Sequence, residues 1–265
     1  MERVVAVLKC FTPDTRELGV SQISRRAGIP KATTHRILVT LTKDGLLERN
    51  NKTGNYRIGP ELYMLGSIYL STTDIVSAAK PVTKVLNDLT AETVHVSIFY
   101  RGNVLIIMKE ESKHTFRVSQ HIGTIVPAYA SAMGKAFLSE LTDAEIDNLI
   151  PDEKLKPITS KTIATKTELK RELKQIRNSG IAIDNEGTLE AIIGTGALIR
   201  DDTGRAVTAI GIPFPIFRLN KAGSERIQNL VKMGASLISY RLGYQGSGTP
   251  IRSLEEIIDY WKGIN

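Results

Sequence analysis

Residues 18–59 have the sequence LGVSQISRRAGIPKATTHRILVTLTKDGLLERNNKTGNYRIG, which predicts two helices separated by a tight turn. In the first helix, Ile23 and Ala27 lie four residues apart, the spacing of one buried helix face. Gly28 can end that helix, and Pro30 suits the start of the next because its missing N–H would be unpaired there. We therefore predict a helix-turn-helix.

The second helix has an apolar stripe made by Ile37, Leu38 and Leu41, so its leading end faces solvent. Short hydrogen-bonding and basic side chains on such an end can reach base edges in the major groove of DNA. The residues of the two helices that we assign to DNA binding are Arg25, Arg26, Lys31, Thr33, Thr34, His35 and Arg36.

A β-hairpin is predicted after these helices. It follows Gly45, and its two short strands are expected at residues 46–49 and 56–58. The turn between the strands is polar and carries Lys52, which can lie along a phosphate backbone. Two helices and such a hairpin make a winged helix-turn-helix, which we place at residues 1–59.

A helix-turn-helix pattern can also arise by chance in an ordinary three-helix bundle. The distribution of charge distinguishes the two interpretations. Residues 1–59 contain 11 Lys or Arg and 5 Asp or Glu, so they carry +6 of the chain's net charge of +7. A solvated surface has no reason to concentrate positive charge in one segment, whereas a surface that binds phosphates does. The charge distribution therefore favours double-stranded DNA as a partner.

The whole composition is that of a soluble globular protein. Of the 265 residues, 42% are hydrophobic and 24% are charged, and the length suits two domains of ordinary size. No apolar run approaches the roughly 20 residues that span a bilayer, and the amino end lacks the pattern of a signal peptide. We expect a cytoplasmic protein that does not enter a membrane.

Neither a metal site nor a cofactor site is predicted. The single cysteine, Cys10, cannot form an intramolecular disulfide and belongs to no ligand cluster. His95, His114 and His121 are scattered among predicted strands without the spacing of metal ligands, so we assign them structural roles. We expect no metal and no cofactor.

The pattern changes after the wing. Residues 60–73 predict a linker helix, and residues 74–265 predict an α+β domain. Helices of this domain are expected near residues 82–89, 128–138, 169–180, 222–242 and 253–264. Strands are expected at residues 94–100, 104–108, 116–119, 181–184, 192–200 and 206–213. A mostly antiparallel sheet flanked by helices can enclose a pocket for a small molecule.

The second domain offers little for catalysis. Asp201 and Asp202 precede Thr203 and Gly204 in a predicted hairpin turn, where acidic residues are common for turn formation alone. The serines near the 128–138 segment have no histidine or acid at an interpretable spacing. We therefore expect no catalytic residues and no enzymatic activity.

The chain resembles the IclR family of bacterial and archaeal transcriptional regulators along nearly its whole length. The N-terminal motif of the family is matched at residues 21–31, 35–38 and 56–60. The family pattern is also matched at Thr33, but Ala32 and Thr34 stand where the family often carries Ser and Val, which implies a different operator sequence. The resemblance also implies a GAF-like effector domain, with the linker helix at the junction of a dimer.

The resemblance further implies an effector site in the second domain. Residues 126–136 look like the family segment in which backbone amides and small side chains at a helix start hold a polar or anionic ligand. The predicted effector-binding residues are Ala132, Met133, Asp184, Gly194, Gly211 and Pro213. At the last three positions relatives often have Cys or Ser. We therefore expect a roomier, less polar pocket and a larger effector, aromatic or derived from a sugar acid.

Together these features predict a sequence-specific transcription regulator whose operator affinity changes when a small metabolite binds. We expect a homodimer or tetramer whose recognition helices read a pseudo-palindromic operator, acting by repression or by activation. The alternative is a small-molecule-binding protein or enzyme whose winged module makes protein contacts. Such a protein would show no salt-dependent affinity for DNA.

Overall fold

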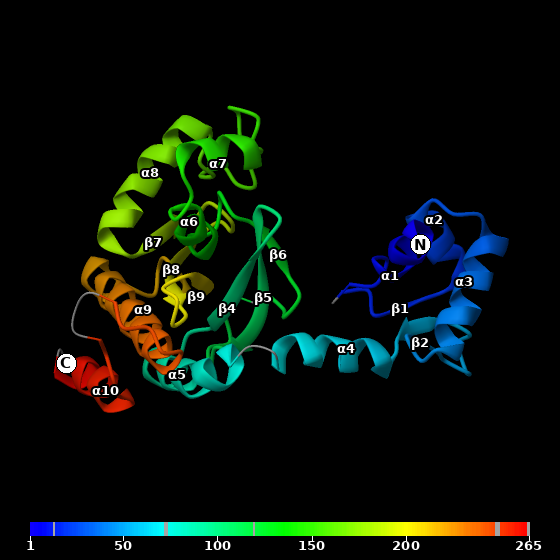
Figure 1. The fold of residues 1–265 in the computed structure, drawn as a ribbon, viewed down its shortest axis with the longest axis horizontal. Coiled ribbons are helices and arrows are strands. Elements are labelled where there is room, and N and C mark those ends of the chain that lie inside the picture. Colours follow the sequence, from blue (N-terminus) through cyan, green and yellow to red (C-terminus); the bar gives the residue numbers. More distant parts are fainter. Residues whose placement is uncertain (13, 72–73, 119, 247–249, 264–265) are drawn as a thin grey trace. The chain divides into compact units, whose positions relative to one another are not determined.

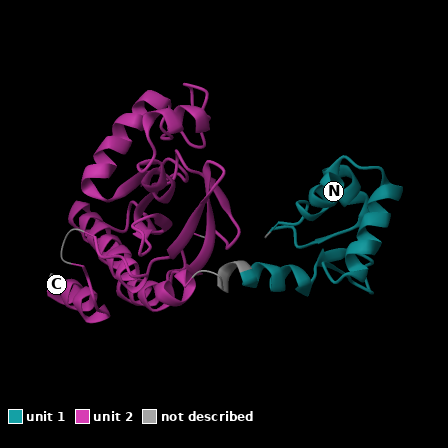
Figure 2. Cartoon of the chain, in the orientation of Figure 1, with its two compact units in different colours: residues 1–73 teal, residues 74–265 magenta. Residues whose placement is uncertain are grey.

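The computed structural model divides into two compact units, Met1–Thr73 and Asp74–Asn265 (Figure 2). Each unit folds around a hydrophobic core of its own. The residues that the structure describes are 1–12, 14–71, 74–118, 120–246 and 250–263.

The first unit combines helices with a small sheet (Figure 1). Its helices are α1 (Glu2–Leu8), α2 (Val20–Ala27), α3 (Lys31–Lys43) and α4 (Pro60–Ser71). Its strands are β1 (Glu17–Leu18), β2 (Leu47–Arg49) and β3 (Tyr56–Ile58), paired antiparallel in the order β1-β3-β2. β2 and β3 form the predicted wing. β1 was not predicted, because a strand of two residues is too short to show an alternation of polar and apolar side chains.

The turn between α2 and α3 has the predicted geometry. Gly28 ends α2 with a φ of +66°, a left-handed conformation that glycine adopts without strain. Ile23, Ile29 and Leu38 are buried around the turn in the core of the unit. The prediction of a helix-turn-helix is confirmed.

Some residues of predicted elements lie outside the described residues. They are Thr72 and Thr73 in the linker helix, Ser119 in a strand and Ile264 in the tail helix. Within the described part of the chain, α4 follows the wing directly from Pro60, and the tail helix α10 spans Leu254–Gly263.

The second unit is built on a six-stranded sheet (Figure 1). The strands are β4 (Val94–Tyr100), β5 (Asn103–Glu110), β6 (Ile125–Pro127), β7 (Ala182–Asn185), β8 (Ile192–Arg200) and β9 (Ala206–Pro215). Their order is β6-β5-β4-β9-β8-β7, and all neighbouring strands pair antiparallel. The prediction of an α+β domain with a mostly antiparallel sheet is confirmed.

Helices cover both faces of this sheet. α5 (Ile75–Thr90), α9 (Lys221–Arg241) and α10 contribute to one hydrophobic core, and α6 (Ala132–Leu138), α7 (Asp143–Leu149) and α8 (Lys166–Ser179) contribute to a second. Alternation along β8 separates the two faces, because Ala197 and Ile199 belong to the first core while Leu198 packs on the second. Side chains on the Leu198 face therefore point toward α6.

One predicted strand does not form. Residues 116–118, the described part of that prediction, are irregular. Side chains from elsewhere bind this backbone in place of a neighbouring strand: the Thr93 hydroxyl donates to Val118 O (3.3 Å), and Arg218 Nη2 donates to Phe116 O (2.7 Å). The prediction of a strand is therefore wrong there, and we call the irregular residues 116–118 the strap.

α6 lies directly on backbone atoms. A Cβ atom on Gly196 of β8 would lie 2.7 Å from Met133 N, and a Cβ atom on Gly134 of α6 would lie 2.3 Å from Ala128 Cα. Neither position has space for a side chain, so each requires glycine. Gly196 thus sets the distance of α6 from the sheet, and Gly134 sets its distance from the backbone at Ala128, just after β6.

We expect Gly134→Ala to lower the free energy of unfolding by about 1–3 kcal/mol, because its methyl group would overlap backbone atoms. Gly263→Ala in the last turn of α10 is the matched control, since a Cβ there meets no atom within 4 Å. Alanine favours a helix over glycine by up to about 1 kcal/mol, so the control should not be destabilising. Urea unfolding of the full chain measures both variants, and equal stability of the two would contradict the close packing of α6.

Candidate DNA-binding and effector sites

The leading end of α3 is open to solvent, with one exception. The predicted side chains that reach solvent there are Lys31, Thr33, His35 and Arg36. Thr34 is 0% exposed, and its hydroxyl donates to Ile29 O (3.3 Å) and Pro30 O (3.2 Å). The prediction that Thr34 lies on the exposed end is wrong, because this side chain holds the turn between the two helices.

The exposed face of α3 extends one turn beyond the predicted residues. Val39 is 51% exposed, and Thr40 beside it is exposed as well. These residues follow His35 and Arg36 by four positions, which places them on the same helix face. An exposed valine there can contact a thymine methyl group. Sequence reasoning missed Val39 because an apolar residue within a helix pattern is usually assigned to the core.

The two predicted arginines of α2 differ in their surroundings, although both are exposed. Arg26 Nη1 donates to Cys10 O (3.1 Å) and so ties α2 to the residues after α1. Arg25 makes no such bond within the described part of the chain, so its guanidinium can turn toward a phosphate. The structure thus favours Arg25 as the DNA contact of this helix.

A carboxylate holds the wing in place. Glu17 Oε1 on β1 accepts hydrogen bonds from the Asn50 amide (3.1 Å) and the Thr53 hydroxyl (2.5 Å). These bonds fix the turn of the wing, and Lys52 is exposed at its tip. Sequence reasoning missed the role of Glu17 because its partner Asn50 lies 33 residues away in the chain.

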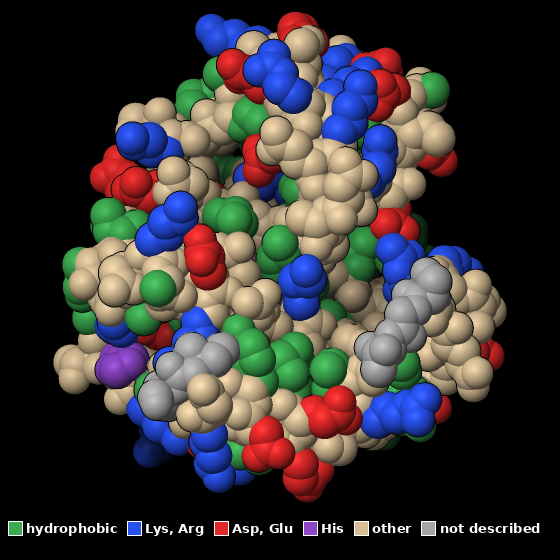
Figure 3. Space-filling view, turned by 90° about the vertical axis from the view of Figure 1, so that its left-hand side faces the viewer, with side chains coloured by type: hydrophobic (Ala, Val, Ile, Leu, Met, Phe, Trp, Pro, Cys, Tyr) green, Lys and Arg blue, Asp and Glu red, His purple; other side chains and the backbone are tan. Residues whose placement is uncertain are grey.

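The second unit shows no comparable charge bias. Residues 74–265 carry a net charge of +2, because the chain carries +7, residues 1–59 carry +6, and Glu61 gives residues 60–73 a charge of −1. On the face of the molecule in Figure 3, Lys and Arg side chains are interspersed with Asp and Glu. Positive charge is therefore concentrated in the unit that holds the helix-turn-helix.

The predicted effector residues meet on the sheet face that α6 covers. Asp184, Gly194 and Pro213 are cross-strand neighbours on β7, β8 and β9. A Cβ atom on Gly194 would lie 3.3 Å from Asp184 Cβ and 3.7 Å from Ala132 Cβ. Tertiary folding thus places the start of α6 beside three strands that are distant from it in the sequence.

Met133 fills the space that Gly211 leaves. A Cβ atom on Gly211 would lie 2.9 Å from Met133 Cγ and 3.2 Å from Met133 Sδ. The hydroxyl of Ser97 donates to the same sulfur at 3.2 Å. The expectation of a roomier pocket is therefore wrong at Gly211, because the methionine side chain occupies that volume.

Asp184 is buried, and both of its oxygens are engaged. Oδ1 accepts a hydrogen bond from Gly187 N (2.6 Å), and Oδ2 accepts one from the Thr188 hydroxyl. Burial raises the pKa of the Asp184 carboxyl, against the lowering effect of these bonds and of Lys135. Through these hydrogen bonds the Asp184 carboxylate holds the loop that follows β7.

A cavity of about 330 Å³ opens beside Asp184 at the β7 edge of the sheet. Lys135 is buried in its wall, and Lys135 Nζ lies 2.5 Å from Glu172 Oε1. Tyr129 and Lys161 also line the cavity. Of the six predicted effector residues, only Asp184 is among the lining residues.

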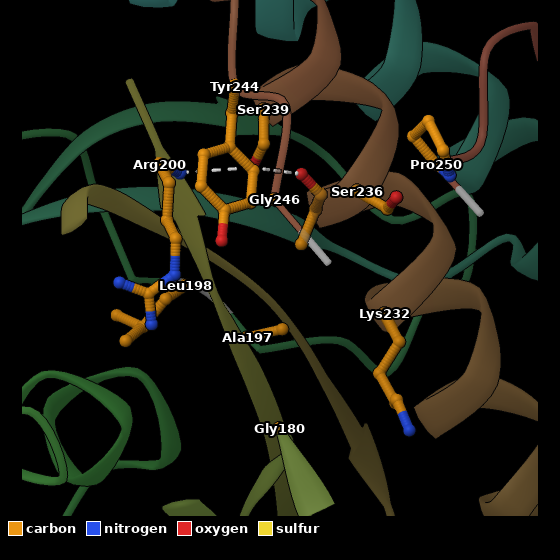
Figure 4. A pocket seen from close by; sticks show the side chains of 11 residues that line it. Gly180, Ala197, Leu198, Arg200, Lys232, Ser236, Ser239, Tyr244, Gly246 and Pro250 are labelled. Carbon is orange, nitrogen blue, oxygen red and sulfur yellow. Dashed lines mark hydrogen bonds between the residues drawn. The ribbon is translucent and has the colours of Figure 1, made fainter. Parts of the chain in front are cut away.

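A second cavity, of about 220 Å³, lies beside β8 and α9 (Figure 4). Its basic lining residues are Arg200 and Lys232. Arg200 Nη1 already binds the Glu140 carboxylate (2.7 Å) and Gly204 O (3.1 Å). None of the predicted effector residues lines this cavity, so it is separate from the predicted site.

Two family models match the chain, one for each unit. The IclR helix-turn-helix domain matches residues 1–51, and the bacterial transcriptional regulator IclR C-terminal domain matches residues 67–240. The chain belongs to the IclR family. It is a transcription regulator with a DNA-binding domain and a C-terminal effector-binding domain. The relatives of this IclR-family protein are regulators and not enzymes, so the alternative function loses its support.

Named regulators are similar to this IclR-family chain over most of its length. The transcriptional repressor IclR of Escherichia coli is 28% identical over 221 residues, which cover 83% of this chain and 81% of the repressor. The repressor AllR of Salmonella typhimurium is 30% identical over 243 residues, which cover 92% and 89% of the two chains. The fold is also similar to that of an IclR homologue from Microbacterium hydrocarbonoxydans, crystallised with 4-hydroxybenzoate. That structure has a TM-score of 0.81 and 23% identity, over 91% of this chain and 98% of the homologue.

The described ranges of the chain hold neither a membrane-spanning helix nor a cluster of metal-binding side chains. No helix there has the length and apolar character needed to cross a bilayer. No three or more His, Cys, Asp or Glu side chains of those ranges lie close enough together to hold a metal ion.

A buried histidine lies beside the predicted effector residues. His95 on β4 is 1% exposed and is the cross-strand neighbour of Gly211 on β9. Burial, with the Lys109 ammonium nearby, lowers the pKa of His95 to about 3. The imidazole is therefore neutral near pH 7.

We expect the free energy of unfolding to fall by about 2 kcal/mol between pH 7 and pH 5 because of His95. The unfolded chain protonates this histidine with a pKa of about 6.5, whereas the folded chain does so only at about 3, so acid favours unfolding. Urea unfolding of wild type and His95→Leu at both pH values isolates this contribution. The same pH dependence in both proteins would contradict a neutral buried imidazole.

Proposed function

We propose that a homodimer of this regulator reads a pseudo-palindromic operator with two α3 helices, and that a small molecule bound beneath α6 changes its operator affinity. The observation that carries the proposal is the exposed face of α3, which lies on the unit with most of the positive charge. Lys31, His35 and Arg36 would reach base edges, while Arg25 and Lys52 would contact phosphates. A target on DNA supports our proposal of a cytoplasmic location.

An apolar helix supports the proposal of a dimer. Tyr63 on α4 is 78% exposed, and Met64, Leu65 and Ile68 on the same helix are each more than half exposed. A helix that presents four large apolar side chains to solvent fits a surface that a partner covers. A second copy of the chain on this helix would give the pair of winged domains that two half-sites about 34 Å apart require.

The effector part of the proposal rests on the meeting of Ala132, Met133 and Asp184 with Gly194 and Pro213 beneath α6. The homologue crystallised with 4-hydroxybenzoate supports an aromatic acid as the first class of effector to consider. A coupling free energy of about 1–3 kcal/mol between the two sites would change operator affinity roughly 5- to 150-fold. That range is sufficient to switch a promoter.

Arg36→Ala should weaken operator binding by about 1–3 kcal/mol and relax the sequence preference, because a bidentate base contact is lost. Lys52→Ala should lower affinity for all DNA and reduce the salt slope by about one unit. Lys221→Ala is the control, because this side chain is 92% exposed in the second unit and should not affect DNA binding. Fluorescence anisotropy at several salt concentrations measures all three. An Arg36→Ala protein that binds operator like wild type would exclude the proposed recognition face.

Capture of fragmented genomic DNA on the pure protein, followed by sequencing, tests the proposed operator. We expect enrichment of a few promoter fragments that share an inverted repeat, because a two-fold dimer presents two recognition helices. The Arg36→Ala protein is the matched control and should lose the enrichment while retaining salt-dependent binding. Retention without sequence preference by the wild-type protein would argue against a specific operator.

A further inference from the structure

The imidazole of His95 has a nitrogen without a partner. Nε2 is buried and has no hydrogen bond within the described part of the chain. A buried polar atom usually finds a partner, because leaving it unsatisfied destabilises the folded state. An unpartnered nitrogen in the interior of an effector-binding domain is explained if a ligand supplies the missing bond.

His95 lies in the middle of the sheet, on the face that α6 covers. Its cross-strand neighbours are Lys109 on β5 and Gly211 on β9. Ser97, two residues further along β4 and therefore on the same face, donates its hydroxyl hydrogen to Met133. His95 thus shares a face with the predicted effector residues and adjoins one of them.

The surroundings of His95 favour an acid as the ligand. The Lys109 side chain is 11% exposed, and its Nζ lies 3.5 Å from Glu111 Oε2. Burial first, and then the positive charge of Lys109, lower the pKa of His95, so a cation lies near the imidazole. Asp184 would repel a carboxylate, but its oxygens are turned to Gly187 and Thr188. A carboxylate would therefore bind on the His95 side of the face.

The strap, residues 116–118, contacts the residue just before β4, near His95. The Thr93 hydroxyl, in the residue just before β4, donates to Val118 O (3.3 Å). Arg218 Nη2 donates to Phe116 O (2.7 Å). Single side-chain bonds of this kind, without a strand ladder, can open at lower cost than a sheet edge. The strap therefore provides a route to the interior.

We propose that His95 contacts the effector, with Nε2–H donating a hydrogen bond to the carboxylate of a small organic acid that enters beneath the strap. The tautomer that carries the proton on Nε2 makes this bond. The Met133 side chain, which is unbranched and flexible, would move from its contact with Gly211 to admit the body of the acid, while the backbone oxygen of Thr195, 2.5 Å from a Cβ on Gly211, stays in place. This role of His95 rests on the proposed effector site and replaces the structural role assigned to it from sequence.

The substitution His95→Leu tests, without any ligand, whether His95 Nε2 lacks a hydrogen-bond partner in the folded protein. Leucine branches at the same carbon and brings no polar atom into the interior, so the melting temperature at pH 7 should equal or exceed that of wild type. His121→Leu, at a half-buried turn, is the control for loss of a histidine. A fall of more than about 4 °C for His95→Leu alone would reveal a structural partner of the imidazole and overturn the proposal.

Binding of three acids to the full chain tests the ligand contact. Isothermal titration with benzoate, phenylacetate and D-galacturonate should detect binding of at least one. His95→Leu should weaken that binding at least about 10-fold, and His95→Gln, which retains an N–H donor, should weaken it less. Unchanged affinity in His95→Leu would overturn the proposal.

Failure of the wild-type chain to bind any of the three acids would also overturn it, because the acid class is part of the proposal. The capture of promoter DNA is an independent readout. Selective capture together with failed acid binding would leave the DNA-binding regulator in place and reject only the role of His95. Loss of selective capture would instead count against the proposed operator recognition.

Discussion

The contact of α6 with the backbone of the sheet is the constraint on which the second unit depends. Gly196 brings β8 against Met133, and Gly134 brings α6 against Ala128. Because backbone atoms oppose one another in both places, no change of rotamer can relieve an added methyl group. The same contact places the Met133 side chain over Gly211. Gly196 therefore determines both how closely α6 packs on the sheet and where Met133 lies on the effector face.

The first unit meets a different requirement, since it must hold an exposed basic surface rigidly on a small core. It does so with polar side chains that turn inward. Thr34 bonds the turn between α2 and α3, and Glu17 bonds the turn of the wing. Thr34 and Glu17 do not form the basic surface themselves. They position Arg36 and Lys52, whose side chains are exposed. Rigid support keeps the exposed cations at a fixed spacing, as binding to the regularly spaced groups of a DNA duplex requires.

Stability and ligand recognition oppose each other at His95. A neutral imidazole with an unpartnered nitrogen in the middle of a sheet weakens the fold, and an apolar side chain of similar shape would not. Groups that break a local rule of stability are expected at functional sites, where binding a ligand supplies what the free protein lacks. The position of His95 on the α6 face follows this logic, whereas a histidine kept for structure alone would have its nitrogens bonded.

Local patterns in the sequence were sufficient for the helix-turn-helix, the wing and the long strands, because period, turn glycines and charge are properties of adjacent residues. Gly28 ends α2 as its position predicts, and β8 spans the predicted residues 192–200. The burial of Thr34, the bond between Glu17 and the wing, and the filling of the Gly211 space by Met133 were decided only by tertiary structure. Each of these depends on which side chains from separate elements come to share one volume, and no local period encodes that.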